Sequence, residues 1–160
     1  MQSNASKVRQ FTEESTGVPT PKTRKMRLGE VMFLVTMLCE EAMELLAGSP
    51  DEGLTVLDPL ETLIECARSA KLPVKMDVSS EVAIVANQAD AMVDIMYFCY
   101  NAAAKAGIDC DEAFAIVHEA NMRKRFPDDQ FHRNANGKVE KPPGWKEPDL
   151  KSLAGKWMGQ

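Results

Sequence analysis

The chain has 160 residues, with 19 Lys and Arg against 24 Asp and Glu, which gives a formal net charge of -5. This length predicts one compact domain that can bury a core without disulfides. The acidic balance argues against a protein that binds long nucleic acids or anionic membranes, since such proteins normally carry a basic surplus. The composition, 44% hydrophobic, excludes a disordered chain. The longest apolar run, residues 31–39, is about half of the ~20 residues that a membrane span needs.

The four cysteines lie among apolar neighbours and form no C-x-x-C pair: Cys39, Cys66, Cys99 and Cys110. This distribution is typical of buried free thiols in a reducing compartment. A zinc site would need closer ligand spacing and more histidine than His118 and His132 provide. The first fourteen residues are polar and lack the apolar core of a secretory signal. We therefore expect a cytoplasmic protein with no membrane partner.

Helical periodicity and capping residues predict up to five helices, at about 1–16, 26–47, 59–71, 81–105 and 109–125. Gly17, Pro19 and Pro21 place a loop between the first two. Gly48 and Pro50 end the second helix.

The later helices begin and end at further signals. Asp58 and Pro59 open the third as an N-cap and a first-turn proline, and Pro73 follows its end. A serine at 79 or 80 caps the long fourth helix, and Gly107 ends it. The fifth begins with a capping box of Asp109 and Glu112.

Residues 127–160 are rich in Asp, Asn, Gly and Pro, which predicts an irregular tail with little regular structure, part of the same domain as 1–126. No segment shows convincing strand alternation. The expected fold is all-α, an antiparallel bundle of four to five helices with an irregular C-terminal tail.

Two of the predicted helices combine an apolar surface nearly all round with a pair of carboxylates. Glu41 and Glu44, at spacing i,i+3, lie on one face of helix 26–47, and Asp90 and Asp94, at i,i+4, lie on one face of helix 81–105. Helices this apolar are expected to be buried on several sides. The carboxylates would then project toward other protein groups and be partly buried.

Four partly buried carboxylates that converge would repel one another unless they were protonated or neutralised. A hard divalent cation neutralises them, and an all-oxygen site favours Mg²⁺ or Mn²⁺ over zinc. The alternative is that the two pairs face different solvent-filled grooves and never meet. Helical periodicity leaves both readings open.

These acids form the pattern of a known family. Residues 40–44 read E-E-x-x-E, and Asp90 and Asp94 precede the aromatic Tyr97 on a later helix. The set resembles the MazG-like and phosphoribosyl-ATP pyrophosphohydrolase-like superfamily of all-α nucleoside triphosphate pyrophosphohydrolases. The likeness covers most of the chain and extends to Val8-x-x-Phe11 with Gly17-Val18-Pro19, to residues 106–109, to Val117-His118-x-x-Asn121-Met122-x-Lys124, to Gly137-Lys138-Val139-x-Lys141-Pro142 and to Pro148-Asp149-Leu150.

The sequence departs from the family pattern in two places. The second acidic motif of the family is usually E-x-x-D, but Ala91 stands where the glutamate is expected before Asp94. An alternative alignment reads Asn87-x-x-Asp90 and puts a weaker ligand first. The segment 48–80 is also long for a connection between the motif helices, so we expect it to add a helix.

The resemblance implies hydrolysis of a nucleoside triphosphate to the monophosphate and pyrophosphate, in clearance of surplus or non-standard nucleotides, by a homodimer or homotetramer. It implies that Glu41, Glu44, Asp90 and Asp94 hold Mg²⁺, with Mn²⁺ as a possible substitute. Glu40 would act with Glu41 in catalysis, as a further ligand or by positioning the attacking water. Asn121 and Lys124 would hold substrate phosphate.

Two alternatives remain at this stage. One is hydrolysis of phosphoribosyl-ATP on the same core, which the tail and the 48–80 segment make less favoured. The other is a non-catalytic helical binding or assembly module, which the displaced second motif favours. The basic cluster Lys22, Arg24, Lys25 and Arg27 is more typical of a solvated loop than of a triphosphate site.

Overall fold

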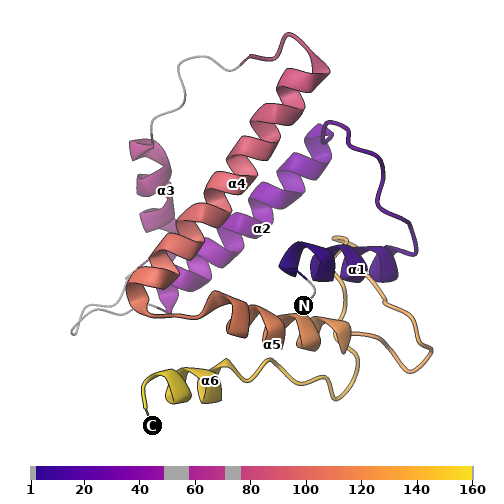
Figure 1. Cartoon of the computed structure of the whole chain (residues 1–160), viewed down its shortest axis with the longest axis vertical. Coiled ribbons are helices and arrows are strands. Elements are labelled where there is room, and N and C mark those ends of the chain that lie inside the picture. The colour runs from indigo at the N-terminus through magenta and orange to yellow at the C-terminus, as the bar shows by residue number, and fades with distance from the viewer. Residues whose placement is uncertain (1–2, 49–57, 71–76, 160) are drawn as a thin grey trace. The chain divides into compact units, whose positions relative to one another are not determined.

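The computed structural model describes residues 3–48, 58–70 and 77–159, and this part of the chain is helical without strands (Figure 1). Its helices are α1 (Asn4–Thr16), α2 (Leu28–Ala47), α3 (Pro59–Ser69), α4 (Glu81–Ala106), α5 (Cys110–Met122) and α6 (Leu150–Trp157). The predicted all-α class is confirmed. Pro50 and Pro73, which were expected to punctuate the chain, lie outside the described residues.

The described residues divide into two compact units, and the division falls inside α4. The first unit comprises the described residues of 1–22 and 93–160, and the second those of 23–92. The C-terminal tail therefore belongs to the same unit as α1 and α5.

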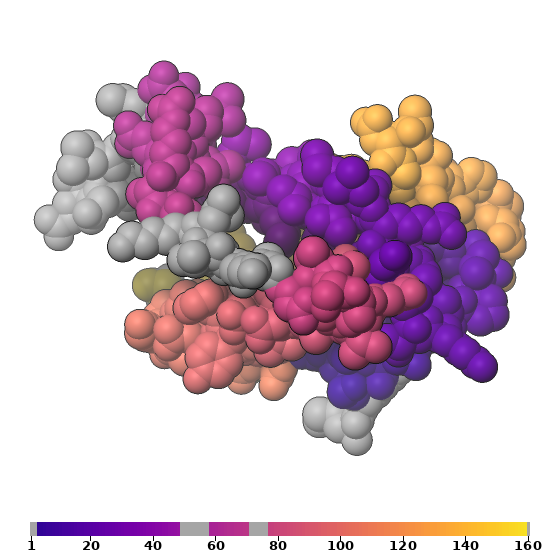
Figure 2. Space-filling model, turned by 90° about the horizontal axis from the view of Figure 1, so that it is seen from above, coloured from indigo at the N-terminus to yellow at the C-terminus, as the bar shows by residue number. Residues whose placement is uncertain are grey.

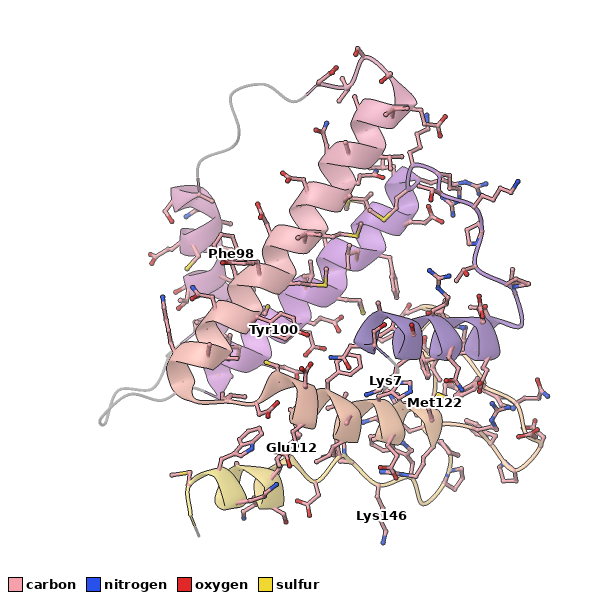
Figure 3. All side chains as sticks on the ribbon, viewed as in Figure 1. Lys7, Phe98, Tyr100, Glu112, Met122 and Lys146 are labelled. Atoms are coloured by element: carbon pink, nitrogen blue, oxygen red, sulfur yellow. The ribbon has the colours of Figure 1, made fainter. Side chains whose placement is uncertain are left out.

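In the first unit, α1 and α6 both pack against α5, on opposite sides of it (Figure 1). The small core consists of Ser15, Ala120 and Leu153, each less than a tenth exposed. Glu112 of α5 lies toward α6 (Figure 3), where its carboxylate accepts hydrogen bonds from Lys156 Nζ at 2.6 Å and Trp157 Nε1 at 3.0 Å. The C-terminal helix is thus attached to α5 by charge as well as by packing.

Two long-range contacts attach α1 to the tail of the same unit. The rings of Phe11 and Phe131 meet edge to face with centroids 5.5 Å apart. Arg133 donates to Ser15 Oγ at 3.1 Å. The segment after α5, although mostly irregular, is therefore fixed to the first helix.

In the second unit, α3 packs against α2 (Figure 2). Asp58 caps α3 by accepting from the backbone N–H groups of Leu60 at 2.8 Å and Glu61 at 3.1 Å, as its Asp-Pro sequence predicts. The side chain of Gln88 accepts from the Met26 backbone N–H at 2.8 Å and donates to the Met26 carbonyl at 3.3 Å. Both backbone groups of Met26, in the loop before α2, therefore have hydrogen-bond partners.

The expectation of a tail with little regular structure is wrong over α6. Asp149 caps this helix by accepting from the Ser152 backbone N–H at 3.0 Å and from its hydroxyl at 2.7 Å. Pro148 stands just before the cap, where a helix has not yet begun. A short capped segment therefore becomes helical once Leu153 is buried in the unit's core.

Neither α2 nor α4 contains a buried residue, although both are largely apolar. Large apolar side chains with substantial exposure on these helices include Met32, Phe33, Val35, Val82, Val93, Met96 and Phe98. By length and composition alone, α4 could also cross a membrane, a criterion that the core helices of soluble proteins meet as well. Many exposed large apolar side chains on one helix commonly mark a surface that another protein covers.

Candidate functional site

The acidic motif of α2 borders an open pocket in the second unit. Glu40 and Glu44, one turn apart, line it together with Asp58 at the start of α3, and the pocket has a volume of about 490 Å³. Its other lining residues are Met43, Ala47, Pro59 and Leu60. Glu41 lies on α2 beside this pocket lining and is exposed. The structure therefore brings Asp58, which sequence reasoning assigned only to capping, to the same pocket as two motif glutamates.

The carboxylates of α4 are also exposed. Asp90 and Asp94 lie within a stretch of α4, residues 89–102, in which every residue is exposed. The expectation that Glu41, Glu44 and this pair are partly buried is therefore wrong for the chain by itself. The reason is that a helix surface apolar nearly all round is covered only where another element packs on it, and α4 lacks a buried residue in this chain.

Asn87, the alternative partner of Asp90, is already engaged. Its Nδ2 donates to the Asp77 carbonyl at 2.6 Å, so the amide fixes the loop that leads into α4. This hydrogen bond gives Asn87 a structural role, so the asparagine at this position is explained without a metal ion.

The chemistry of the acid pairs suits a hard divalent cation, because each pair offers carboxylate oxygens from neighbouring turns of a helix. Within the described ranges, however, no three His, Cys, Asp or Glu side chains lie close enough together to hold a metal ion. Each carboxylate pair therefore offers oxygen atoms that suit Mg²⁺, but the described residues assemble no group of three such ligands.

The predicted phosphate residues lie at the C-terminal end of α5, in the first unit. Asn121 is half-buried in the last turn, and Lys124 follows just beyond the helix. Lys124 Nζ lies 5.5 Å from the centroid of the Trp145 ring, and Lys141 Nζ lies 4.5 Å from the same centroid. Burial, and secondly the charge of Lys141, lowers the pKa of the Lys124 ammonium below its ordinary value.

Sequence reasoning did not find the pairing of Lys124 with Lys141 and Trp145. The motif that contains Lys141 is part of the family resemblance, but nothing in the local pattern of the tail indicates that it returns to the end of α5.

The basic segment before α2 behaves as a structural element. The Arg24 guanidinium makes two hydrogen bonds to Glu30, of 2.9 and 2.6 Å, and the Arg27 backbone N–H donates to the same carboxylate at 2.6 Å. These donors, the guanidinium first, lower the pKa of Glu30 to about 2. Arg24, one cation of this cluster, therefore forms an ion pair with the first turn of α2.

The described residues define an all-α protein that carries carboxylate pairs on two of its helices. The family model of phosphoribosyl-ATP pyrophosphohydrolase matches residues 8–121, a segment that contains both acidic pairs. The chain belongs to this family, and it is a hydrolase that acts on a phosphoanhydride.

A solved structure supports this assignment over nearly the whole chain. The crystal structure of a "putative NTP pyrophosphohydrolase" from Exiguobacterium sp. 255-15 is similar, with a TM-score of 0.73 and 27% sequence identity. The similarity covers 99% of this chain and 96% of that one, so it includes the tail as well as the motif helices. No curated protein sequence matches the chain significantly.

Proposed function

We propose that this protein is a Mg²⁺-dependent nucleoside triphosphate pyrophosphohydrolase that clears nucleotides from the cytoplasmic pool. The main support is that a single family match, over residues 8–121, contains both the E-E-x-x-E motif of α2 and the aspartate pair of α4. In the reaction, water adds to the α-phosphorus, the bond to the bridging oxygen breaks, and pyrophosphate leaves. The products are the nucleoside monophosphate and pyrophosphate.

In this proposal Glu41, Glu44, Asp90 and Asp94 hold Mg²⁺, or Mn²⁺ in its place. Their exposed carboxylates are oxygen donors of the kind that these cations prefer. When bound, such a cation offsets the negative charge of the phosphate oxygens.

The further roles fall to Glu40, Asn121 and Lys124. Glu40, which shares a pocket with Glu44, orients the attacking water together with Glu41 and accepts its proton. Asn121 and Lys124 donate hydrogen bonds to the phosphates. Charge-assisted bonds of this kind are about twice as strong as neutral ones.

The experiment is a product analysis on the purified full-length chain with Mg²⁺ and a panel of NTPs and dNTPs, run in ¹⁸O-labelled water. We expect pyrophosphate and a monophosphate that carries the label. Release of single phosphate, or label in the pyrophosphate, would contradict attack at the α-phosphorus.

A second substrate deserves the same test because the matching family model describes phosphoribosyl-ATP pyrophosphohydrolase. Phosphoribosyl-ATP contains the same phosphoanhydride chain, so the proposed roles of the carboxylates apply to it without change. Comparison of kcat/KM for phosphoribosyl-ATP with the values for the NTP panel identifies the preferred substrate. A ratio above unity for phosphoribosyl-ATP would replace our first assignment.

We also propose that the protein works as a homodimer or homotetramer. The support is the exposed apolar surface of α2 and α4, on which side chains such as Phe33, Val93 and Phe98 are each more than two-fifths exposed. Burial of such side chains against a second copy is favourable by roughly 25 cal/mol per Å² of apolar area. Light scattering after size exclusion should give a mass of two or four chains, and a monomeric mass at micromolar concentration would contradict this.

A further inference from the structure

Two lysine ammonium groups lie over a single tryptophan ring in the first unit. Lys141 Nζ is 4.5 Å and Lys124 Nζ is 5.5 Å from the centroid of Trp145. The ring is fixed in place because its Nε1 donates a 2.8 Å hydrogen bond to the carbonyl of Ala120, a fully buried residue of α5. The indole therefore lies close to two like charges, one just after α5 and one in the tail.

Two further cations line a pocket that includes the Trp145 ring. A pocket of about 430 Å³ is lined by Arg123, Pro142, Pro143, Gly144, Trp145 and Lys146. Lys146 points outward, away from the ribbon (Figure 3). Arg123 and Lys146 thus add two positive charges to the lining of this pocket, which shares Trp145 with Lys124 and Lys141, in a chain whose net charge is -5.

Acidic partners offset only part of this charge. Arg123 pairs with Glu119 at 2.9 Å, an exposed contact, and Lys141 lies 3.8 Å from Glu147. Lys124 has no carboxylate partner among residues 3–48, 58–70 and 77–159. A half-buried cation beside a second cation is unfavourable in isolation, and the cation–π contact with Trp145 offsets part of this cost.

We propose that Lys124 and Lys141 form a binding site for a pyrophosphate group, with Trp145 as the residue that positions the two ammonium groups. The ligand is the diphosphate part of the substrate and the pyrophosphate that is released from it, so this inference rests on the proposed function. Two adjacent phosphate groups present several anionic oxygens, and each ammonium can donate to one of them. The indole N–H is already bonded to Ala120, so the ring contributes position and not a further donor.

The test is calorimetric titration of the full-length protein with inorganic pyrophosphate, in EDTA so that no divalent cation takes part and no turnover occurs. Lys141→Gln should raise the Kd about tenfold or more, which is typical for loss of a charge-assisted hydrogen bond. Lys141→Arg keeps the charge and should retain most of the affinity. Lys151→Gln, an exposed lysine on α6, is the matched control and should bind as the unmodified chain does.

A spectroscopic readout locates the ligand independently of affinity. In a Trp157→Phe background, Trp145 is the remaining tryptophan, and its fluorescence should change on addition of pyrophosphate with the same midpoint as the heat signal. Circular dichroism verifies that each variant is folded. Absence of pyrophosphate binding, or equal affinity in Lys141→Gln and the unmodified chain, would overturn the inference.

The two proposals fail in different ways. If the protein hydrolyses nucleoside triphosphates but pyrophosphate binds without dependence on Lys141, the binding site is wrong and the proposed function stands. If pyrophosphate binds with dependence on Lys141 but no triphosphate is hydrolysed, the proposed function is wrong and the site is a pyrophosphate site of another kind.

Discussion

Trp145 Nε1 donates a hydrogen bond of 2.8 Å to the carbonyl oxygen of Ala120, which lies 25 residues earlier in the chain. Ala120 is only 1% exposed, and its carbonyl belongs to the last turns of α5, where helix carbonyls lack intrahelical partners. This bond brings the irregular tail back to α5 and sets the position of the ring over which Lys124 and Lys141 lie.

The first prediction concerns this bond. Trp145→Phe keeps an aromatic ring but removes the donor, so it should lower the free energy of unfolding by about 1 kcal/mol, the net contribution of a typical hydrogen bond. Urea unfolding followed by circular dichroism measures the change. Trp157→Phe is the comparison, and its effect should be smaller because Glu112 keeps its bond to Lys156. Equal losses of unfolding free energy in the two variants would contradict a specific contribution of the hydrogen bond to Ala120.

A second prediction concerns the start of α5. Asp109 accepts hydrogen bonds of 3.0 Å from the backbone N–H groups of Asp111 and Glu112. Asp109→Ala should therefore cost about 1 kcal/mol of stability, as loss of an N-cap commonly does. Asp109→Asn retains a capping oxygen and should stay within a few tenths of a kcal/mol of the unmodified chain. If both variants unfold at the same denaturant concentration, the cap does not stabilise this helix.

The pair of Arg24 and Glu30 makes stability depend on pH in the acid range. The pKa of Glu30 is about 2 in the folded chain, below its ordinary value of 4.5, because the Arg24 guanidinium and the Arg27 N–H bond its ionised form. The unfolded chain therefore binds more protons between these two values. The stabilisation is complete above a pH of about 4.5 and is lost as the pH falls toward 2.

Glu30→Gln should remove this pH-dependent stabilisation. The melting temperature of the variant should therefore fall less steeply than that of the unmodified chain between pH 4.5 and pH 2. Differential scanning calorimetry across this window measures both slopes. Because both side chains are about two-fifths exposed, added salt should weaken the difference. Parallel slopes at low salt would contradict the role of the pair.

The fourth prediction concerns catalysis. Glu41→Gln keeps the size of the side chain but removes the charge with which it would hold Mg²⁺, so kcat should fall by about 100-fold or more, at least the loss seen for groups that support metal ligands. Steady-state pyrophosphate release measures the loss. Glu65→Gln, an exposed glutamate on α3, should leave the rate unchanged. Full activity of the Glu41 variant would contradict its assignment to the metal.

The helices could be predicted because their signals are local. Asp58 and Asp109 bond to N–H groups two and three residues further along the chain, a contact that depends on no distant part of the fold. The same reasoning placed Glu41 with Glu44 and Asp90 with Asp94, since a residue's direction on a helix follows from 100° per residue. It did not find α6, whose Asp149 cap stands in a Pro-rich tail and whose Leu153 is buried only by packing.

By itself, then, the sequence determined the all-α class, the approximate bounds of the main helices and the acidic pairs that form part of the family pattern. Tertiary structure decided the exposure of those acids, the pocket that Asp58 shares with Glu40 and Glu44, and the contacts of Lys124 and Lys141 with Trp145. The physical reason is the range of the interactions involved. Caps and helical periodicity act within one turn, whereas burial and the Trp145 contact depend on which distant segments pack together.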